Sequence, residues 1–114
     1  MIELPWPPKE LSPNARVHRM QKAAKAKKYR ELCRIIALAS KLKPPADGKI
    51  HLDILFYPPD RRKRDLDNLL ASIKSGIDGI ADAWKINDTR FRPYTIDFAD
   101  ETGPKVEIRI KYAQ

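Results

Sequence analysis

The spacing of apolar residues along the chain predicts two amphipathic helices. Residues 15–43 contain no proline or glycine, and their apolar side chains recur at intervals of three and four. These side chains are Tyr29, Leu32, Cys33, Ile36 and Ala39. A second run with a period of 3.6 residues covers residues 68–84, with apolar side chains at Leu69, Leu70, Ile73, Ile77, Ile80 and Trp84. Each helix is therefore expected to pack one apolar side against another element.

Residues that alternate between apolar and polar predict strands on both sides of the second helix. Apolar residues at every second position from Ile50 to Phe56 predict a strand over residues 50–57. Shorter segments of the same kind predict three further strands, at residues 2–6, 94–98 and 106–110. The prolines near the N-terminus exclude a continuous helix or a central strand, so residues 7–15 are expected to form a loop.

The elements follow the order β-α-β-α-β-β, without repeats or low-complexity segments. The polar segment Asp100–Gly103 predicts a tight turn, so the last two strands are expected to form a hairpin. Both apolar helix faces are buried if the helices cover one face of a mixed sheet, which predicts a two-layer α+β fold. A chain of 114 residues is long enough for one hydrophobic core, so residues 1–114 are expected to form a single domain.

Composition and charge narrow the class of protein. The chain has 23 Lys and Arg against 15 Asp and Glu, a net charge of +8. Such an excess favours a polyanionic partner, because Lys and Arg displace counterions from phosphates. There is no apolar run of about 18 residues and no secretory signal pattern, so a cytoplasmic protein without membrane contact is expected. Cys33 is the only cysteine, which excludes an intramolecular disulfide.

Two cation-rich segments are candidates for contact with nucleic acid. The first has no acidic residue before Glu31 and includes Arg16, Arg19, Lys22, Lys25, Lys27, Lys28 and Arg30. The second consists of Arg61, Arg62, Lys63 and Arg64. Arginines and lysines of this kind are expected to hold phosphates, and a solvated basic loop is the alternative interpretation of the second segment.

The second cation-rich segment runs directly into Asp65-Leu66-Asp67-Asn68. Residues two apart share one side of an extended chain, so Asp65 and Asp67 can face one metal ion if the chain is extended here and Asp67 or Asn68 caps the helix. Two nearby carboxylates repel unless a cation neutralises them, and Mg²⁺ prefers such oxygen ligands. A helix cap or a solvated turn without a metal is the alternative interpretation.

Two further residues are candidates for the same site. Asp88 lies in the turn after the second helix, and it can reach Asp67 as a third metal ligand if the chain doubles back along that helix. Lys74 follows Asp67 by almost two helical turns, so both project from one side of the helix. Lys74 can hold the scissile phosphate or pair with Asp78 at the surface, and the sequence leaves both interpretations open.

The sequence resembles the RusA family of Holliday junction resolvases, small endonucleases typical of bacteria and their phages. The resemblance spans most of the chain and rests on four segments, which are Leu4–Pro8, Arg61–Leu69, Lys74–Asp78 and Trp84–Asp88. It implies a homodimer that binds four-way DNA junctions in recombination and repair. It also implies paired, symmetric nicks made with Mg²⁺ or Mn²⁺ and without a small-molecule cofactor.

The resemblance further implies roles for individual residues. Asp65, Asp67 and Asp88 match the family's three essential carboxylates, and a lysine of the same helix completes the catalytic set. Family members commonly carry that lysine four residues after the second Asp, where this chain has Ala71, so Lys74 is expected to take its role. A basic DNA-binding or junction-binding protein without catalysis is the second hypothesis, and an RNA-directed nuclease or toxin is the third.

Overall fold

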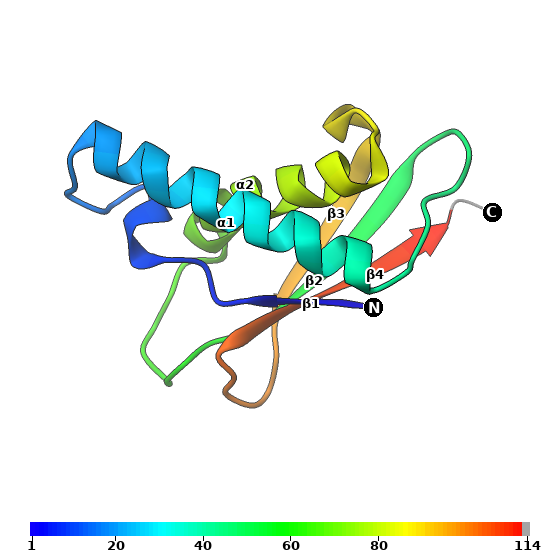
Figure 1. Ribbon diagram of the computed structural model, residues 1–114. Coiled ribbons are helices and arrows are strands. Elements are labelled where there is room, and N and C mark those ends of the chain that lie inside the picture. Colours follow the sequence, from blue (N-terminus) through cyan, green and yellow to red (C-terminus); the bar gives the residue numbers. More distant parts are fainter. Residues whose placement is uncertain (113–114) are drawn as a thin grey trace.

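The computed structural model describes residues 1–112, in which two long helices cover one face of a four-stranded mixed sheet (Figure 1). The elements in chain order are β1 (Ile2–Pro5), the short 3-10 helix η1 (Lys9–Leu11), α1 (Arg19–Ala39), β2 (Ile50–Tyr57), α2 (Leu66–Trp84), the 3-10 helix η2 (Asp88–Arg90), β3 (Phe91–Phe98) and β4 (Lys105–Tyr112). The predicted two-layer α+β fold and its order of main elements are confirmed.

The strands do not lie side by side in chain order. The order across the sheet is β1-β4-β2-β3, in which β4 is antiparallel to both neighbours and β3 is parallel to β2. The predicted hairpin between β3 and β4 is therefore wrong. Val106 and Ile108 of β4 are fully buried, as expected for a strand that has a neighbour on each side and one face on the core.

The segment that follows β3 carries the chain across the end of β2. The Ala99 N–H donates to the Phe56 carbonyl at 2.8 Å, and the Gly103 N–H donates to the Pro58 carbonyl at 2.7 Å. These bonds satisfy carbonyl groups at the point where prolines end the strand. Helix α2 links the parallel strands β2 and β3, because parallel neighbours need a crossover connection.

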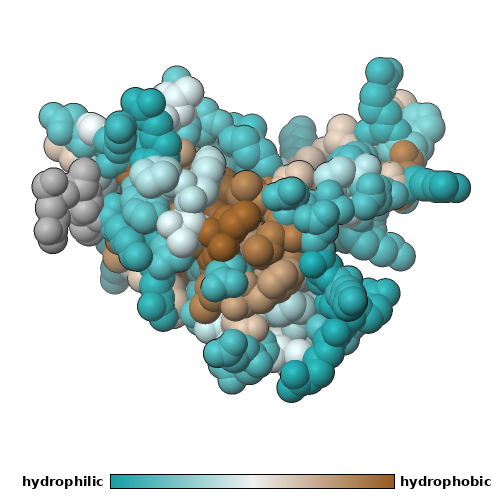
Figure 2. Space-filling view, turned by 180° about the vertical axis from the view of Figure 1, so that it is seen from behind, coloured by the Kyte–Doolittle hydropathy of each residue, from teal (hydrophilic) through white to brown (hydrophobic). Residues whose placement is uncertain are grey.

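The hydrophobic core lies between the sheet and the two helices. Ile54 and Phe56 of β2 are completely buried, and so are Ile73, Ile77 and Ile80 of α2. The apolar side predicted for α2 is therefore confirmed. The side chains of β3 are less completely buried, since Ile96 and Phe98 are half-buried. Figure 2 shows an apolar patch surrounded by hydrophilic side chains at the centre of the rear surface.

Helix α1 is shorter than predicted and its buried side is rotated. It begins at Arg19, where the His18 side chain caps it by accepting the Met20 N–H at 3.1 Å. It ends at Ala39, four residues before the predicted end. Its buried side chains are Tyr29, Cys33 and Ala37. Leu32, expected on this side, is 45% exposed. Within residues 1–112, no helix combines the length and the apolar character needed to cross a membrane.

Helices α1 and α2 approach so closely that backbone touches backbone. A Cβ atom added at Gly79 would collide with the carbonyl oxygen of Arg30. A Cβ atom added at Gly76 would lie 2.8 Å from the ring of Tyr29. The Tyr29 hydroxyl also donates to the Pro5 carbonyl at 2.5 Å, which fastens α1 to the end of β1. The contact between the helices therefore depends on the absence of side chains at two positions of α2.

We expect Gly79→Ala to lower the free energy of unfolding by about 2 kcal/mol, because the added methyl group must push α1 away from α2. Ala favours a helix over Gly by about 1 kcal/mol, so any loss marks a steric conflict that outweighs this gain. Urea unfolding followed by circular dichroism measures the change.

The matched control for this prediction is Ser75→Ala on the same helix. The buried Ser75 hydroxyl has no hydrogen-bond partner among residues 1–112, so its removal should leave the stability unchanged or raise it. A Gly79→Ala protein that unfolds at the same urea concentration as the parent would contradict the close backbone contact.

Candidate active site

The chain changes from extended loop to helix at Asp65. Asp65 is the N-cap of α2 with extended backbone angles (φ −98°, ψ 122°), and its Oδ1 accepts the Asp67 N–H at 3.0 Å. The Asp65 carbonyl accepts the Leu69 N–H at 3.1 Å. The prediction that Asp67 or Asn68 caps this helix is wrong, because Asp65 already satisfies N–H groups of the first turn and the helix begins at the next residue.

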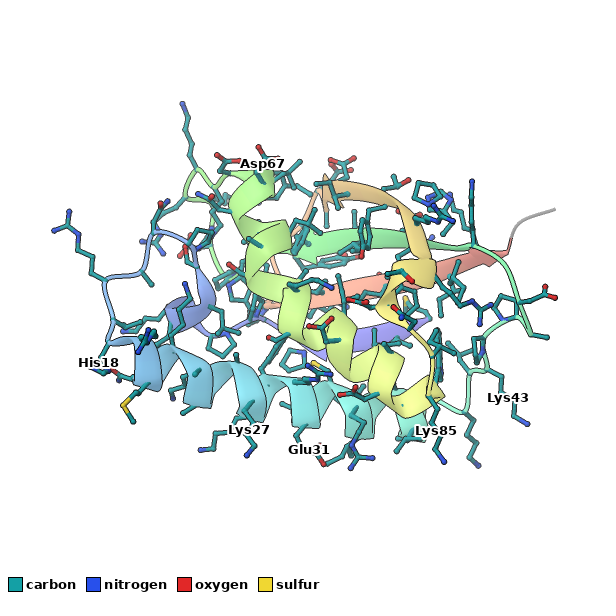
Figure 3. All side chains as sticks on the ribbon, turned by 90° about the horizontal axis from the view of Figure 1, so that it is seen from above. His18, Lys27, Glu31, Lys43, Asp67 and Lys85 are labelled. Carbon is teal, nitrogen blue, oxygen red and sulfur yellow. The ribbon has the colours of Figure 1, made fainter. Side chains whose placement is uncertain are left out.

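This cap gathers two carboxylates at the N-terminus of α2. Asp67 is the second residue of the helix, and both it and Asp65 are exposed. Figure 3 shows Asp67 at the outer end of α2. The positive end of the helix dipole favours negative charge at this position. The cap uses Oδ1 of Asp65, which leaves its other oxygen and the Asp67 carboxylate as possible ligands for a cation.

The cation-rich loop at residues 61–64 contains two kinds of cation. Arg64 is held within the loop, since its Nη1 lies 2.9 Å from Oδ1 of Asp60 and its side chain is only 13% exposed. The hydrogen bond from Arg64 lowers the pKa of Asp60 to about 2. Arg62 also contacts Asp60, with its Nε 3.4 Å from Oδ1, but its side chain is 79% exposed. Arg64 therefore stabilises the loop, while its three neighbours face the solvent.

The N-terminal cations lie on α1 or just before it. Arg16 precedes the helix, and the helix itself carries Arg19, Lys22, Lys25, Lys27 and Lys28. Lys22 is half-buried, and its Nζ donates to the Ser12 carbonyl at 3.4 Å. In Figure 3, Lys27 points away from α2 and lies across the helix layer from Asp67. Contacts of Lys27 with DNA would therefore involve a part of the duplex distant from the paired carboxylates.

The chain doubles back after α2 and brings Asp88 to Lys74. Lys85 ends the helix in the left-handed conformation (φ 55°), and Asp88 begins η2 with Asn87 as its cap. The ammonium of Lys74 donates to Asp88 at 2.7 Å and to Asp78 at 2.9 Å. The surface pair between Lys74 and Asp78 thus forms, and Lys74 contacts one of the candidate catalytic acids as well.

Hydrogen bonds between Lys74 and its acidic neighbours shift the pKa values of Lys74 and Asp88. The hydrogen bond from Lys74 lowers the pKa of Asp88 below its ordinary value. Partial burial lowers the pKa of Lys74, but its hydrogen bonds to Asp88 and Asp78 outweigh burial and raise the pKa overall. At neutral pH the lysine is therefore positive and Asp88 is negative.

Arg30 extends this group of charges to α1. Its guanidinium donates to the Asp82 carboxylate through Nε at 2.6 Å and Nη2 at 2.8 Å, and its Nη1 lies 4.0 Å from Asp78. The sequence placed Arg30 only among the N-terminal cations expected to contact DNA, and it gave no sign of Asp82. The spacing of four residues from Lys74 to Asp78 and again to Asp82 marks one side of α2. The contribution of Arg30 comes from another helix, and no spacing along the chain reveals it.

The described residues 1–112 contain no group of three His, Cys, Asp or Glu side chains that could hold a metal ion. Asp65 and Asp67 lie together at the start of α2, whereas Asp88 lies beside Lys74, which is about 10 Å further along the helix at 1.5 Å per residue. The two carboxylates at the helix start fit Mg²⁺, which typically binds one or two carboxylates together with waters and substrate phosphates.

Paired, exposed carboxylates beside a cationic loop are typical of a protein that handles the phosphates of a nucleic acid. The family model described as Endodeoxyribonuclease RusA matches residues 5–111, so the chain belongs to the RusA family. The chain is also 52% identical over 93 residues to an uncharacterized protein of Xylella fastidiosa (strain Temecula1 / ATCC 700964). This match covers 79% of the chain and 61% of the relative, so the chain spans about three fifths of that protein's length.

Two substitutions of Asp65 separate its role in the helix from any role in chemistry. Asp65→Ala removes the cap and is expected to lower the free energy of unfolding by about 1 kcal/mol. Asp65→Asn keeps a side-chain oxygen that caps equally well, so the stability should stay the same although the negative charge is lost. Thermal unfolding of both variants measures the difference, and equal destabilisation by Asn and Ala would contradict the capping role.

Proposed function

We propose that this protein is a Mg²⁺-dependent endodeoxyribonuclease that resolves Holliday junctions by paired, symmetric nicks in DNA recombination and repair. Its membership of the RusA family supports an activity on DNA. The observation that carries the proposal is the exposed pair of Asp65 and Asp67 at the N-terminus of α2, directly after the exposed cations of loop 61–64. Such carboxylates are suited to a divalent metal ion, and such cations are suited to phosphates.

In this proposal Asp65 and Asp67 hold Mg²⁺ or Mn²⁺, which when bound polarises a phosphoryl oxygen and lowers the pKa of a bound water. The chain's own groups bind and orient the DNA. Arg62 and its exposed neighbours hold phosphates on either side of the scissile bond, and the cations of α1 hold more distant phosphates of the junction arms. Correct orientation of the phosphate against the carboxylate pair supplies a large part of the rate enhancement.

Lys74 is proposed to stabilise negative charge on the scissile phosphate. It lies on the same side of α2 as Asp67, and its flexible side chain ends in a compact positive charge. Asp88, the third acid in the proposal, orients this ammonium through their hydrogen bond. A role for Asp88 as a metal ligand requires it to leave Lys74 and to approach the start of the helix.

We further propose a homodimer, encoded by a bacterium or a phage and active in the cytoplasm. An open four-way junction has near two-fold symmetry, and two sites related by a two-fold axis match it. Two such sites allow paired nicks in opposite strands, whereas one site makes single nicks.

A synthetic four-way junction tests the endonuclease proposal. With Mg²⁺ the parent protein is expected to nick two opposite strands, as measured on denaturing gels. Asp67→Asn keeps the size of the side chain but removes the charge that holds the metal ion. This change should cost about 3 kcal/mol of transition-state stabilisation, or roughly a hundredfold in cutting rate.

The control for this experiment is Asp53→Asn, which removes a carboxylate from the face of the sheet opposite the helices and should leave cutting unchanged. Junction binding, measured by fluorescence anisotropy without metal, should be similar for all three proteins. Tight binding without cutting by the parent supports a non-catalytic junction-binding protein instead. Equal cutting of duplex RNA and the junction supports an RNA-directed nuclease instead.

The role of Lys74 is tested by moving the lysine along α2. Lys74→Gln is expected to lower the cutting rate at least about tenfold, because a positive charge near the phosphate is lost. Its loss from a surface ion pair should cost less than about 1 kcal/mol of stability. Adding Ala71→Lys to this variant restores a lysine on the same side of the helix, one turn from Asp67, and should recover part of the rate. Full activity of Lys74→Gln alone contradicts the assignment.

A further inference from the structure

A groove lies beside Asp65, between the N-terminal segment and the loop that precedes α2. Its volume is about 1070 Å³, and it extends from Trp6 across Phe98 to the first turn of α2. Ligand pockets in proteins typically measure about 300–1,000 Å³, so this groove has room for a nucleotide and part of its neighbours. The proposed roles of Asp65 and of the exposed cations use only one edge of this groove, and they leave Trp6 and Phe98 without a role.

The floor of the groove is aromatic and firmly held. Trp6 is half-buried and packs edge to face against Phe56, with ring centroids 6.2 Å apart and an interplanar angle of 80°. The guanidinium carbon of Arg64 lies 5.7 Å from the centre of the Trp6 ring. Arg64 is fixed in turn by its ion pair with Asp60. Tryptophan rings and guanidinium planes of this kind are surfaces on which nucleic acid bases stack.

The rim of the groove carries the opposite charge to DNA. Four of the residues that line the groove are cations and one is an acid, namely Lys9, Arg62, Lys63 and Arg64 against Asp65. Of these cations, only Arg64 is largely covered. Exposed cations around an aromatic floor match the two parts of a nucleotide, because the base can stack while its phosphates meet positive charge.

We propose that this groove binds an unpaired base of the DNA strand that is cut, with the base stacked against Trp6 and Arg64. The inference rests on the proposed endonuclease function, since it sets the base next to Asp65. It also gives a physical reason for a preference for branched DNA. A base leaves its stack at low cost where pairing is already interrupted, whereas a base in continuous duplex must first be unpaired.

The test is a thermodynamic cycle that combines a protein change with a DNA change. One component is Trp6→Leu, and the other is a set of four-way junctions, each with an abasic site at one nucleotide near the branch point. Dissociation constants are measured by fluorescence anisotropy without a divalent ion, so that no strand is cut. We expect Trp6→Leu to weaken binding of the intact junction about tenfold. For one position of the abasic site, Trp6→Leu should cause no further loss.

Two controls separate stacking from folding. Trp6→Phe keeps an aromatic ring and should retain most of the affinity, whereas Trp84→Phe changes the other tryptophan, which packs near Leu42 and away from the groove, and should show no coupling to any abasic site. Thermal unfolding identifies a variant that is not folded. If Trp6→Leu is not folded, the same cycle is run with Trp6→Phe against Trp6→His, which must still rank by stacking strength.

Three results overturn the proposal. Trp6→Leu can leave binding unchanged, or it can weaken all junctions by the same factor at every abasic position. It can also dissociate a dimer in sedimentation experiments and lower the affinity for every DNA equally, which assigns the groove to a second copy of the chain. Cutting in Mg²⁺ is scored separately. Coupling without cutting removes the endonuclease proposal and retains the groove, and cutting without coupling does the reverse.

Discussion

The direct backbone contact between α1 and α2 determines where every candidate functional group lies. Gly79 allows the two helices to touch, and α2 in turn contacts β3 of the sheet. The start of α2 exposes Asp65 and Asp67 to solvent, while its end returns the chain to Lys74 through the left-handed residue Lys85. A wider separation of the helices would shift both ends of α2 together. The geometry of the site therefore depends on the packing of the core.

The cations of this protein divide into those that stabilise the fold and those that face the solvent. Arg30 links the two helices through Asp82, and Arg64 closes the loop through Asp60. Such pairs leave little charge for a ligand. Exposed cations such as Arg61 and Lys63 provide the positive potential that a basic chain offers to polyanions. The net charge of +8 alone is therefore a poor guide to the affinity for polyanions, because the cations held in ion pairs contribute little to it.

Sequence patterns predicted what depends on neighbours in the chain and failed where distant elements decide. The period of the apolar residues predicted α2 and its buried side, because the residues on one face of a helix recur at every turn along the sequence. The hairpin prediction was wrong because a turn signal after β3 does not show which strand edge is free to pair. Strand β4 pairs with β1 and β2 instead. Asp88 was predicted as a site residue from the sequence. Its pairing with Lys74 could not be predicted, because it depends on how tightly the chain turns after Trp84.

The charges along α2 suggest why binding and cutting can be separate events. Lys74 and Arg30 face the three carboxylates Asp78, Asp82 and Asp88, which leaves one negative charge, and Asp65 and Asp67 add two more. A phosphate that approaches this side of the helix meets repulsion, although the chain as a whole is positive. In the proposed function, a divalent ion that neutralises the carboxylate pair makes close approach favourable, next to the exposed cations of loop 61–64. DNA that contacts only the outer side of α1 is then bound but lies away from the groups proposed to cut it.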